Sequence, residues 1–197
     1  MQARPPPPFS AVLLAGGRST RMGRDKALLP LADGRTLLAR QLATLRAAGA
    51  AEVLVSARAE QHLPLAGTRL IPDLQPDRGP LAGLAAALAT AAHDRVLVLA
   101  IDLPQMPPEF IARLVGESTP ACGVVPTRDG RPEPLAAVYP RAAVSVAAEL
   151  LIAGELRAVE FACRLAAHGL VRWRVIAPVE TVYFSNWNTP ADVGGGS

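Results

Sequence analysis

The sequence predicts an α/β protein with one mostly parallel, Rossmann-like sheet and helices on both of its faces. Strand-like apolar runs alternate with helical patterns along the chain, an order typical of parallel sheets. The runs are continuously apolar rather than alternating, as in strands buried on both faces. The 197 residues, of which 50% are hydrophobic, suit a single domain with a sizeable core. We therefore expect one domain over residues 9–192, after a proline-rich extension at 1–8 and before a flexible tail at 193–197.

Two strands of the first half are expected to end at residues that could bind a ligand or take part in a reaction. The apolar run 11–15 predicts a strand that stops at Gly16-Gly17, and the run 95–101 predicts a strand that stops at Asp102. Ligands of such sheets bind at the carboxyl ends of the strands. The other elements expected in this half are a helix at 36–48 with Thr36 as its N-cap, a strand at 52–57 and a helix at 80–92.

The second half continues the alternation of helices and apolar runs. A helix is expected from Pro107-Pro108 to about residue 115. The remaining expected elements are apolar runs at 121–126 and 134–139, helices at 141–153 and 157–168, a strand at 171–177 and a short segment at 181–185.

The charge and the apolar runs exclude several classes of protein. The net charge is +3, and residues 1–30 hold five basic side chains against the single acid Asp25. A surplus of positive charge confined to one short segment fits a binding site for a small anion rather than a nucleic-acid-binding surface. The Ala-rich stretch 81–92 is too short to span a bilayer. Cys122 and Cys163 form no disulfide framework, so we expect both to be buried and the protein to be cytoplasmic.

The loop at 14–26 concentrates groups that bind phosphate. It contains three glycines, two hydroxyl side chains, three arginines and Lys26, which is the only lysine among the 20 lysine and arginine residues. Glycine lets the backbone approach an anion closely, Arg21 can form forked bonds to phosphate oxygens, and Lys26 supplies a compact, movable charge. The spacing matches neither a P-loop nor the dinucleotide fingerprint. The alternatives are a glycine-rich turn with solvated arginines and a chance scarcity of lysine.

The order Leu-Ala-Gly-Gly-x-Ser-x-Arg-Met-Gly-x-Asp-Lys in this loop resembles the signature of the molybdenum cofactor nucleotidyltransferases. Within that family it looks most like the guanylyltransferases. The resemblance implies the nucleotide-diphospho-sugar transferase type of fold. It continues at Asp73 with the block 79–83, at Asp102-Leu103-Pro104, at 134–139 and at 184–190, so it spans nearly the whole chain.

The resemblance also implies roles for single residues. The implied catalytic residues are Arg21, Lys26 and Asp102; the first two would also hold the triphosphate, and Asp102 would ligate Mg²⁺. Guanine and ribose would be held by Leu14, Ala15, Gly16 and Gly17, and the nucleotide would also lie by Asp73. The metal and the pterin would lie near Asn186 and Asn188. Where the family often carries a nucleotide-binding Asn, this chain has Ser56, which offers a weaker hydrogen bond.

Several of these positions have a second interpretation. Asp102 can be the N-cap of the following helix, although Pro104, Pro107 and Pro108 place the helix start later. Asp73 can be a turn residue after Pro72. Trp187 can stack on a pterin or pack under the last helix, 157–168. The three histidines are isolated in sequence, and no Cys/His cluster has the spacing of a zinc site.

The resemblance implies transfer of GMP from GTP to molybdopterin, with Mg²⁺ as cofactor and pyrophosphate as the second product. Other cofactor-biosynthesis proteins and molybdoenzyme-specific chaperones would be partners, and neither nucleic acid nor membrane would be. Three alternatives stay open: a cytidylyltransferase for the same pterin, a sugar- or polyol-phosphate nucleotidyltransferase, and a nucleotide-binding accessory protein without turnover. Gly16-Gly17 favours guanine, because the cytidine-specific relatives look more like Leu-Ala-Ala-Gly.

Overall fold

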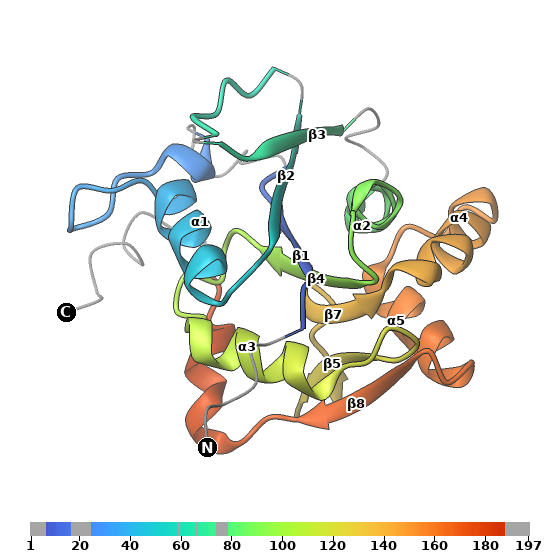
Figure 1. Ribbon diagram of the computed structural model, residues 1–197. Coiled ribbons are helices and arrows are strands. Elements are labelled where there is room, and N and C mark those ends of the chain that lie inside the picture. The colour runs from blue at the N-terminus through green and yellow to red at the C-terminus, as the bar shows by residue number, and fades with distance from the viewer. Residues whose placement is uncertain (1–6, 17–24, 59, 66, 74–78, 188–197) are drawn as a thin grey trace.

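The computed structural model describes residues 7–16, 25–58, 60–65, 67–73 and 79–187, and it confirms the predicted fold class. One sheet runs in the order β3-β2-β1-β4-β7-β5-β6, with β8 paired to β5 (Figure 1). Strands β1 to β4 are parallel, β7 is antiparallel to β4 and β5, and β8 is parallel to β5. The strands are β1 Ser10–Leu14, β2 Glu52–Arg58, β3 Arg69–Asp73, β4 Arg95–Ala100, β5 Gly123–Arg128, β6 Arg131–Pro132, β7 Ala136–Pro140 and β8 Val171–Val175.

Helices cover both faces of the sheet. In Figure 1, α1 and α3 lie on one side, and α2, α4 and α5 lie on the other. The α-helices are α1 Leu37–Ala47, α2 Gly79–Thr90, α3 Pro108–Glu117, α4 Val144–Ile152 and α5 Ala158–Ala167, and the 3₁₀ helices are η1 Lys26–Leu28, η2 Arg141–Ala143 and η3 Pro178–Phe184. Helix α1 begins as predicted, because the Thr36 hydroxyl accepts a hydrogen bond from the Ala39 N–H at 3.1 Å.

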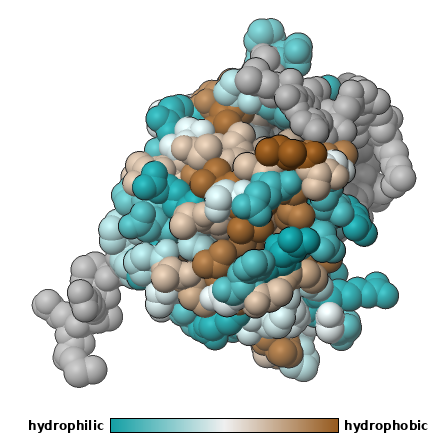
Figure 2. Space-filling view, turned by 90° about the vertical axis from the view of Figure 1, so that its right-hand side faces the viewer, coloured by the Kyte–Doolittle hydropathy of each residue, from teal (hydrophilic) through white to brown (hydrophobic). Residues whose placement is uncertain are grey.

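The two helical layers explain why the central strands are apolar at most positions. In β1, Leu13 belongs to the core beneath α1 and α3, whereas Val12 belongs to the core beneath α2, α4 and α5. Successive side chains of a strand point to opposite faces, so a strand covered on both faces needs apolar residues throughout. Figure 2 views the side of α2, α4 and α5 and shows apolar side chains interspersed with polar ones.

The strand order places a crevice between β1 and β4. The chain moves outward from β1 to β2 through α1, and after β3 it returns through α2 to place β4 on the other side of β1. Leu14 at the end of β1 is in register with Ser56 in β2 and with Ala100 in β4. The loops that follow β1 and β4 therefore leave the sheet at the same level, at the topological switch point where ligands bind in such folds.

Three expectations need correction. Strand β3 was not predicted, and Asp73 is the last residue of this strand, paired with Arg58, rather than a turn residue. Cys163 is exposed and Cys122 is half-buried, so the expectation that both are buried was wrong. For Cys163 the reason is helical phase, because its neighbours Phe161, Ala162 and Leu165 occupy the buried side of α5.

None of the helices in the described ranges is long and apolar enough to cross a membrane.

A buried ion pair joins β8 to η3 and predicts a large loss of stability when it is broken. Both Glu180 oxygens accept from the Arg174 guanidinium, at 2.9 and 3.0 Å, and the guanidinium stacks 4.9 Å from the centre of the Phe110 ring. The two side chains are 14% and 6% exposed. We expect Glu180→Ala to lower the free energy of unfolding by about 3 kcal/mol, because it leaves Arg174 desolvated without its main partner.

The dependence of this effect on pH gives a second check. The Arg174 hydrogen bonds hold the pKa of Glu180 below its ordinary value. The stabilisation is therefore present above the unfolded pKa of glutamate and is lost as the pH falls through the lower folded pKa. Urea unfolding at several pH values measures it. The control is Glu117→Ala, which removes a more exposed partner of Arg174 and is expected to cost about 1 kcal/mol or less. Equal losses of unfolding free energy for the two variants at neutral pH would contradict Glu180 as the main partner of Arg174.

Candidate functional site

Asp102 stands at the crevice, directly after β4. The strand ends at Ala100, and the Ile101 N–H then donates to the Leu14 carbonyl at 3.1 Å, which ties this turn to the end of β1. The Asp102 carbonyl accepts from the Trp187 N–H at 2.9 Å. Helix α3 has Pro107 as its N-cap, so the alternative interpretation of Asp102 as a helix cap is excluded. Its carboxylate therefore does not cap the helix and can bind a ligand or a cation at the carboxyl ends of the strands.

Lys26 reaches the same point from the loop that follows β1. Its Nζ atom lies 3.5 Å from Asp102 Oδ2, and the two side chains are 15% and 28% exposed. The preceding Asp25 fixes the turn: one of its carboxylate oxygens accepts from the Ala27 N–H at 3.0 Å, and the other accepts from the Gln61 amide at 2.6 Å. The single lysine and the carboxylate after β4, far apart in sequence, thus form one charged pair.

The ends of β1, β2 and β3 form a second corner beside this pair. The N–H groups of Ala15 and Gly16 both donate to the Ser56 carbonyl, at 2.8 and 3.0 Å. A Cβ atom on Gly16 would lie 3.6 Å from Asp73 Oδ2, so this carboxylate lies next to the backbone of the loop. The Ser56 side chain is buried on the α2 side, because a Cβ atom on Gly83 would lie 3.2 Å from its hydroxyl oxygen. The group that Ser56 offers to the loop is therefore its carbonyl.

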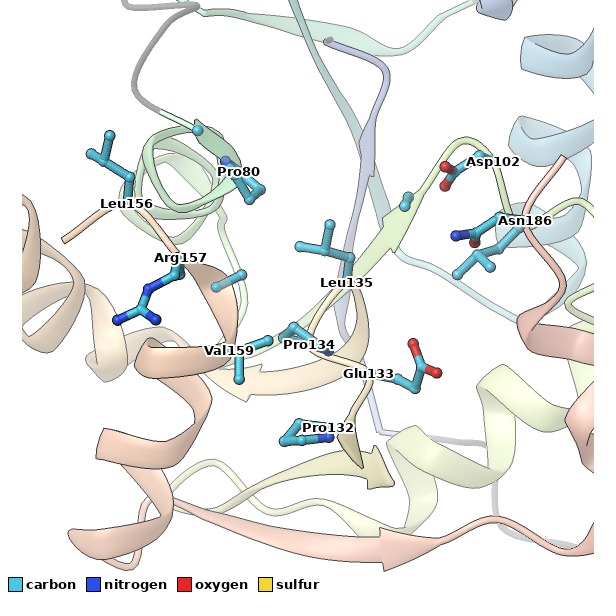
Figure 3. Close-up of a pocket in the computed structure, with 14 residues that line it drawn as sticks. Pro80, Asp102, Pro132, Glu133, Pro134, Leu135, Leu156, Arg157, Val159 and Asn186 are labelled. Atoms are coloured by element: carbon cyan, nitrogen blue, oxygen red, sulfur yellow. The ribbon is translucent and has the colours of Figure 1, made fainter. Parts of the chain in front are cut away.

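A cavity of about 590 Å³ opens on the other side of Asp102. Figure 3 shows Asp102 and Asn186 together at one end and Leu156, Arg157 and Val159 at the other. Most of the lining is apolar, and it comes from the start of α2, the end of β4, the turn between β6 and β7, and the start of α5: Gly79, Pro80, Ala100, Leu103, Pro132, Pro134, Leu135, Leu156, Ala158 and Val159. The size falls in the range of small-molecule sites.

The turn that carries the cavity wall is held firmly. Tyr139 is fully buried, and its hydroxyl donates to the Pro134 carbonyl at 2.7 Å; burial raises the pKa of Tyr139 well above its ordinary value. Glu133 forms an ion pair with Arg128 at 2.9 Å, and burial raises the pKa of the Glu133 carboxyl in spite of this cation. The N–H of Glu133 donates to the Pro126 carbonyl at 2.8 Å. The wall therefore offers a fixed, partly desolvated carboxylate.

The structure brings most of the predicted site residues to one edge of the sheet. Leu14, Ala15, Gly16, Lys26, Ser56, Asp73, Asp102 and Asn186 all lie at or directly after the carboxyl ends of strands β1 to β4 or against them. Gly17, Arg21 and Asn188 lie outside the described residues. Trp187 is 7% exposed and packs in the core beneath α1 and α3, so packing is correct, but it lies on the sheet face opposite α5 rather than under that last helix.

Three side chains that sequence reasoning missed support this edge. Gln41 is fully buried in α1, and its amide lies 3.1 Å from the Leu103 carbonyl in the turn that carries Asp102. Gln41 could have been found from the sequence, because it is a single amide side chain on the apolar side of the predicted helix 36–48. Gln61 links Asp25 to the end of β2 through the Arg58 N–H at 2.8 Å, and no pattern marked it. Glu133 precedes the block 134–139 but carried no signal of its own.

An open, doubly covered sheet with a cation–carboxylate pair at its switch point is the architecture of a nucleotide-binding α/β enzyme. Residues 11–167 match the MobA-like NTP transferase domain family, and the chain belongs to that family of nucleotidyltransferases.

Curated relatives and a solved structure agree with this assignment. A protein of Pelotomaculum thermopropionicum named "Probable molybdenum cofactor guanylyltransferase" is 37% identical over 93% of this chain and 89% of its own length. One of Xanthomonas euvesicatoria named "Molybdenum cofactor guanylyltransferase" is 43% identical over 58% of each chain. The crystal structure of molybdopterin-guanine dinucleotide biosynthesis protein A from Archaeoglobus fulgidus matches with a TM-score of 0.74 and 25% identity, over 93% of this chain and 94% of that one.

Proposed function

We propose that this protein transfers GMP from GTP to molybdopterin, forming the guanine dinucleotide form of the molybdenum cofactor and releasing pyrophosphate. The observation that carries the proposal is the Lys26–Asp102 pair at 3.5 Å, placed between the β1–β3 corner and the apolar cavity. A transfer between two substrates needs two compartments that meet at the reacting groups. The names of the relatives supply the two substrates.

The reaction requires alignment and charge neutralisation more than proton transfer. An oxygen of the acceptor's phosphate attacks the α-phosphorus of GTP, a new P–O bond forms, and the bond to the bridging oxygen breaks as pyrophosphate leaves. The attacking phosphate is already ionised at neutral pH, so no strong general base is needed. Catalysis then depends on holding the reactants in line and stabilising the developing negative charge. Lys26 is suited to the triphosphate, and its place beside the crevice lets its ammonium follow the charge as it moves.

The residues at the crevice fit a magnesium ion. Asp102 and Asn186 present hard oxygen donors at the same end of the cavity. Within the described ranges, no three His, Cys, Asp or Glu side chains gather to enclose an ion. Magnesium keeps several waters and is bound through one or two carboxylates together with substrate phosphates. We therefore assign Asp102 as its protein ligand, where the ion would neutralise phosphate charge.

The nucleotide half of the site is assigned to the β1–β3 corner. Gly16, Asp73 and the carbonyl of Ser56 lie together there. We place the guanosine of GTP against this backbone, together with Gly17, and its phosphates toward Arg21 and Lys26. The acceptor then occupies the cavity, with Asn186 and Asn188 on its side of the metal. We further propose that the protein acts in the cytoplasm, with other cofactor-biosynthesis proteins and molybdoenzyme-specific chaperones as partners.

Pyrophosphate release tests the base preference and the acceptor together. With Mg²⁺ and molybdopterin present, GTP is expected to support release and CTP to support little. EDTA is expected to abolish the reaction, and omission of molybdopterin to reduce it to background. Release with CTP in preference to GTP would assign the protein to cytidylyl transfer. Binding of nucleotide without release from either would contradict the proposed reaction.

A further inference from the structure

The cavity beside Asp102 has a polar side chain in its wall that the reaction does not use. Among the lining residues that the structure describes, four are charged or carry an amide: Asp102, Asn186, Arg157 and Glu133. Asp102 and Asn186 are placed at the metal. The Arg157 guanidinium donates to Glu155 at 2.9 and 2.7 Å, and Figure 3 shows it pointing away from the cavity. Glu133 is left as the charged lining side chain without a role in the reaction.

The Glu133 carboxylate is fixed and incompletely satisfied. Arg128 Nη2 forms an ion pair with Oε1 at 2.9 Å, and among the described residues Oε2 has no hydrogen-bond partner. The side chain is 22% exposed, and Figure 3 shows its carboxylate directed away from Pro132, toward the side of the cavity where Asn186 lies. Burial raises the pKa of this carboxyl. A desolvated carboxylate is stabilised by N–H donors, so the cavity favours a ligand that brings them.

We propose that Glu133 selects the acceptor by receiving the two adjacent N–H groups of a pterin ring, its amino group and the neighbouring ring N–H. This inference rests on the proposed function, because it takes the acceptor to be a pterin. The two N–H groups point in the same direction, so they match the two oxygens of a carboxylate as parallel hydrogen bonds. The flat ring lies between the apolar walls formed by Pro80, Pro134 and Leu135. Glu133 is thus a specificity-determining residue, while Asp102 and Lys26 carry the reaction.

The first arm of the test uses transfer kinetics. Glu133→Gln keeps the shape but presents an amide with less acceptor capacity, so KM for molybdopterin is expected to rise about tenfold to a hundredfold. KM for GTP is expected to stay unchanged. Glu133→Asp, which keeps the charge, is expected to recover part of the loss and covers the case in which the glutamine variant does not fold. The matched control is Glu160→Gln, which removes the same charge from α5 outside the cavity lining.

The second arm uses binding without turnover. Isothermal titration with two soluble probes compares pterin with lumazine, the same ring with a carbonyl in place of the amino group. The unaltered protein is expected to bind pterin more tightly, and Glu133→Gln is expected to lose that preference.

The two arms separate the inference from the function. If the unaltered protein transfers GMP to molybdopterin but Glu133→Gln leaves both the acceptor KM and the pterin preference unchanged, the inference fails and the proposed function stands. A rise in KM for GTP instead would assign Glu133 to guanine, which carries a similar edge, and would also overturn the inference. Preference for pterin in a protein that transfers no GMP would support the binding role and remove the proposed function.

Discussion

Replacing Asp102 by asparagine is expected to lower kcat/KM for GMP transfer by about a thousandfold, which corresponds to about 4 kcal/mol of transition-state stabilisation. The amide removes the negative charge that would hold the metal at the end of β4, and it takes away the ionic partner of Lys26. The backbone of the turn should be unaffected, because it is held by the Leu14 carbonyl and the Trp187 N–H. The thermal midpoint should therefore change little.

Asp94 offers a matched control at the other end of β4. It precedes β4, its side chain is 67% exposed, and it pairs loosely with Arg141 at 3.7 Å. Asp94→Asn changes the same functional group at the opposite end of β4 and is expected to retain nearly full activity. Steady-state kinetics at saturating Mg²⁺, with calorimetry on each variant, measure both effects. Full activity in Asp102→Asn with an intact fold would show that the metal assignment is wrong.

Replacing Lys26 by methionine is expected to raise KM for GTP and lower kcat, with a combined loss of about a hundredfold in kcat/KM, or about 2.7 kcal/mol. Lys26→Arg should recover only a small part of this loss. The side chain is 15% exposed and sits 3.5 Å from Asp102, so the broad guanidinium meets a site built around a compact ammonium. Equal activity of the arginine variant would show that charge alone is needed at this position.

The composition of the chain gives an independent measurement at Lys26. Because it is the only lysine, reductive methylation with isotope-labelled formaldehyde labels one side chain in addition to any free α-amine. Mg-GTP is expected to protect Lys26 from methylation and to protect the activity in parallel, as followed by NMR and mass spectrometry. The Lys26→Met variant supplies the control spectrum. Methylation of Lys26 at an unchanged rate in saturating GTP would contradict contact with the triphosphate.

Local pattern was enough to predict the central strands and their polar ends. The strands that end at Leu14 and Ala100 are apolar after their first residues, Ser10 and Arg95, and Gly16 and Asp102 follow within two residues of their ends. Their parallel pairing brings the two following loops together, as the alternation of strands and helices predicted. The approach of Lys26 to Asp102 follows from that pairing.

Tertiary context decided what the pattern did not show. Strand β3 contains Arg69 and Pro72 and is buried mainly at Ile71, so its strand character comes from pairing with β2. The orientation of Ser56 toward α2 depends on the absence of a side chain at Gly83, a contact across 27 residues of sequence. The cavity and the role of Glu133 depend on where α5 meets the turn before β7. Such contacts between distant segments leave no local signal in one sequence.

Nucleotidyl transfer is tested most directly by following the fate of each phosphate of GTP. The protein is incubated with Mg²⁺, molybdopterin and GTP labelled at either the α- or the γ-phosphate, and the pterin product is separated. We expect the α-label to appear in the pterin product and the γ-label to leave as pyrophosphate. Label from the γ-phosphate in the pterin, or in free monophosphate without any product, would contradict nucleotidyl transfer.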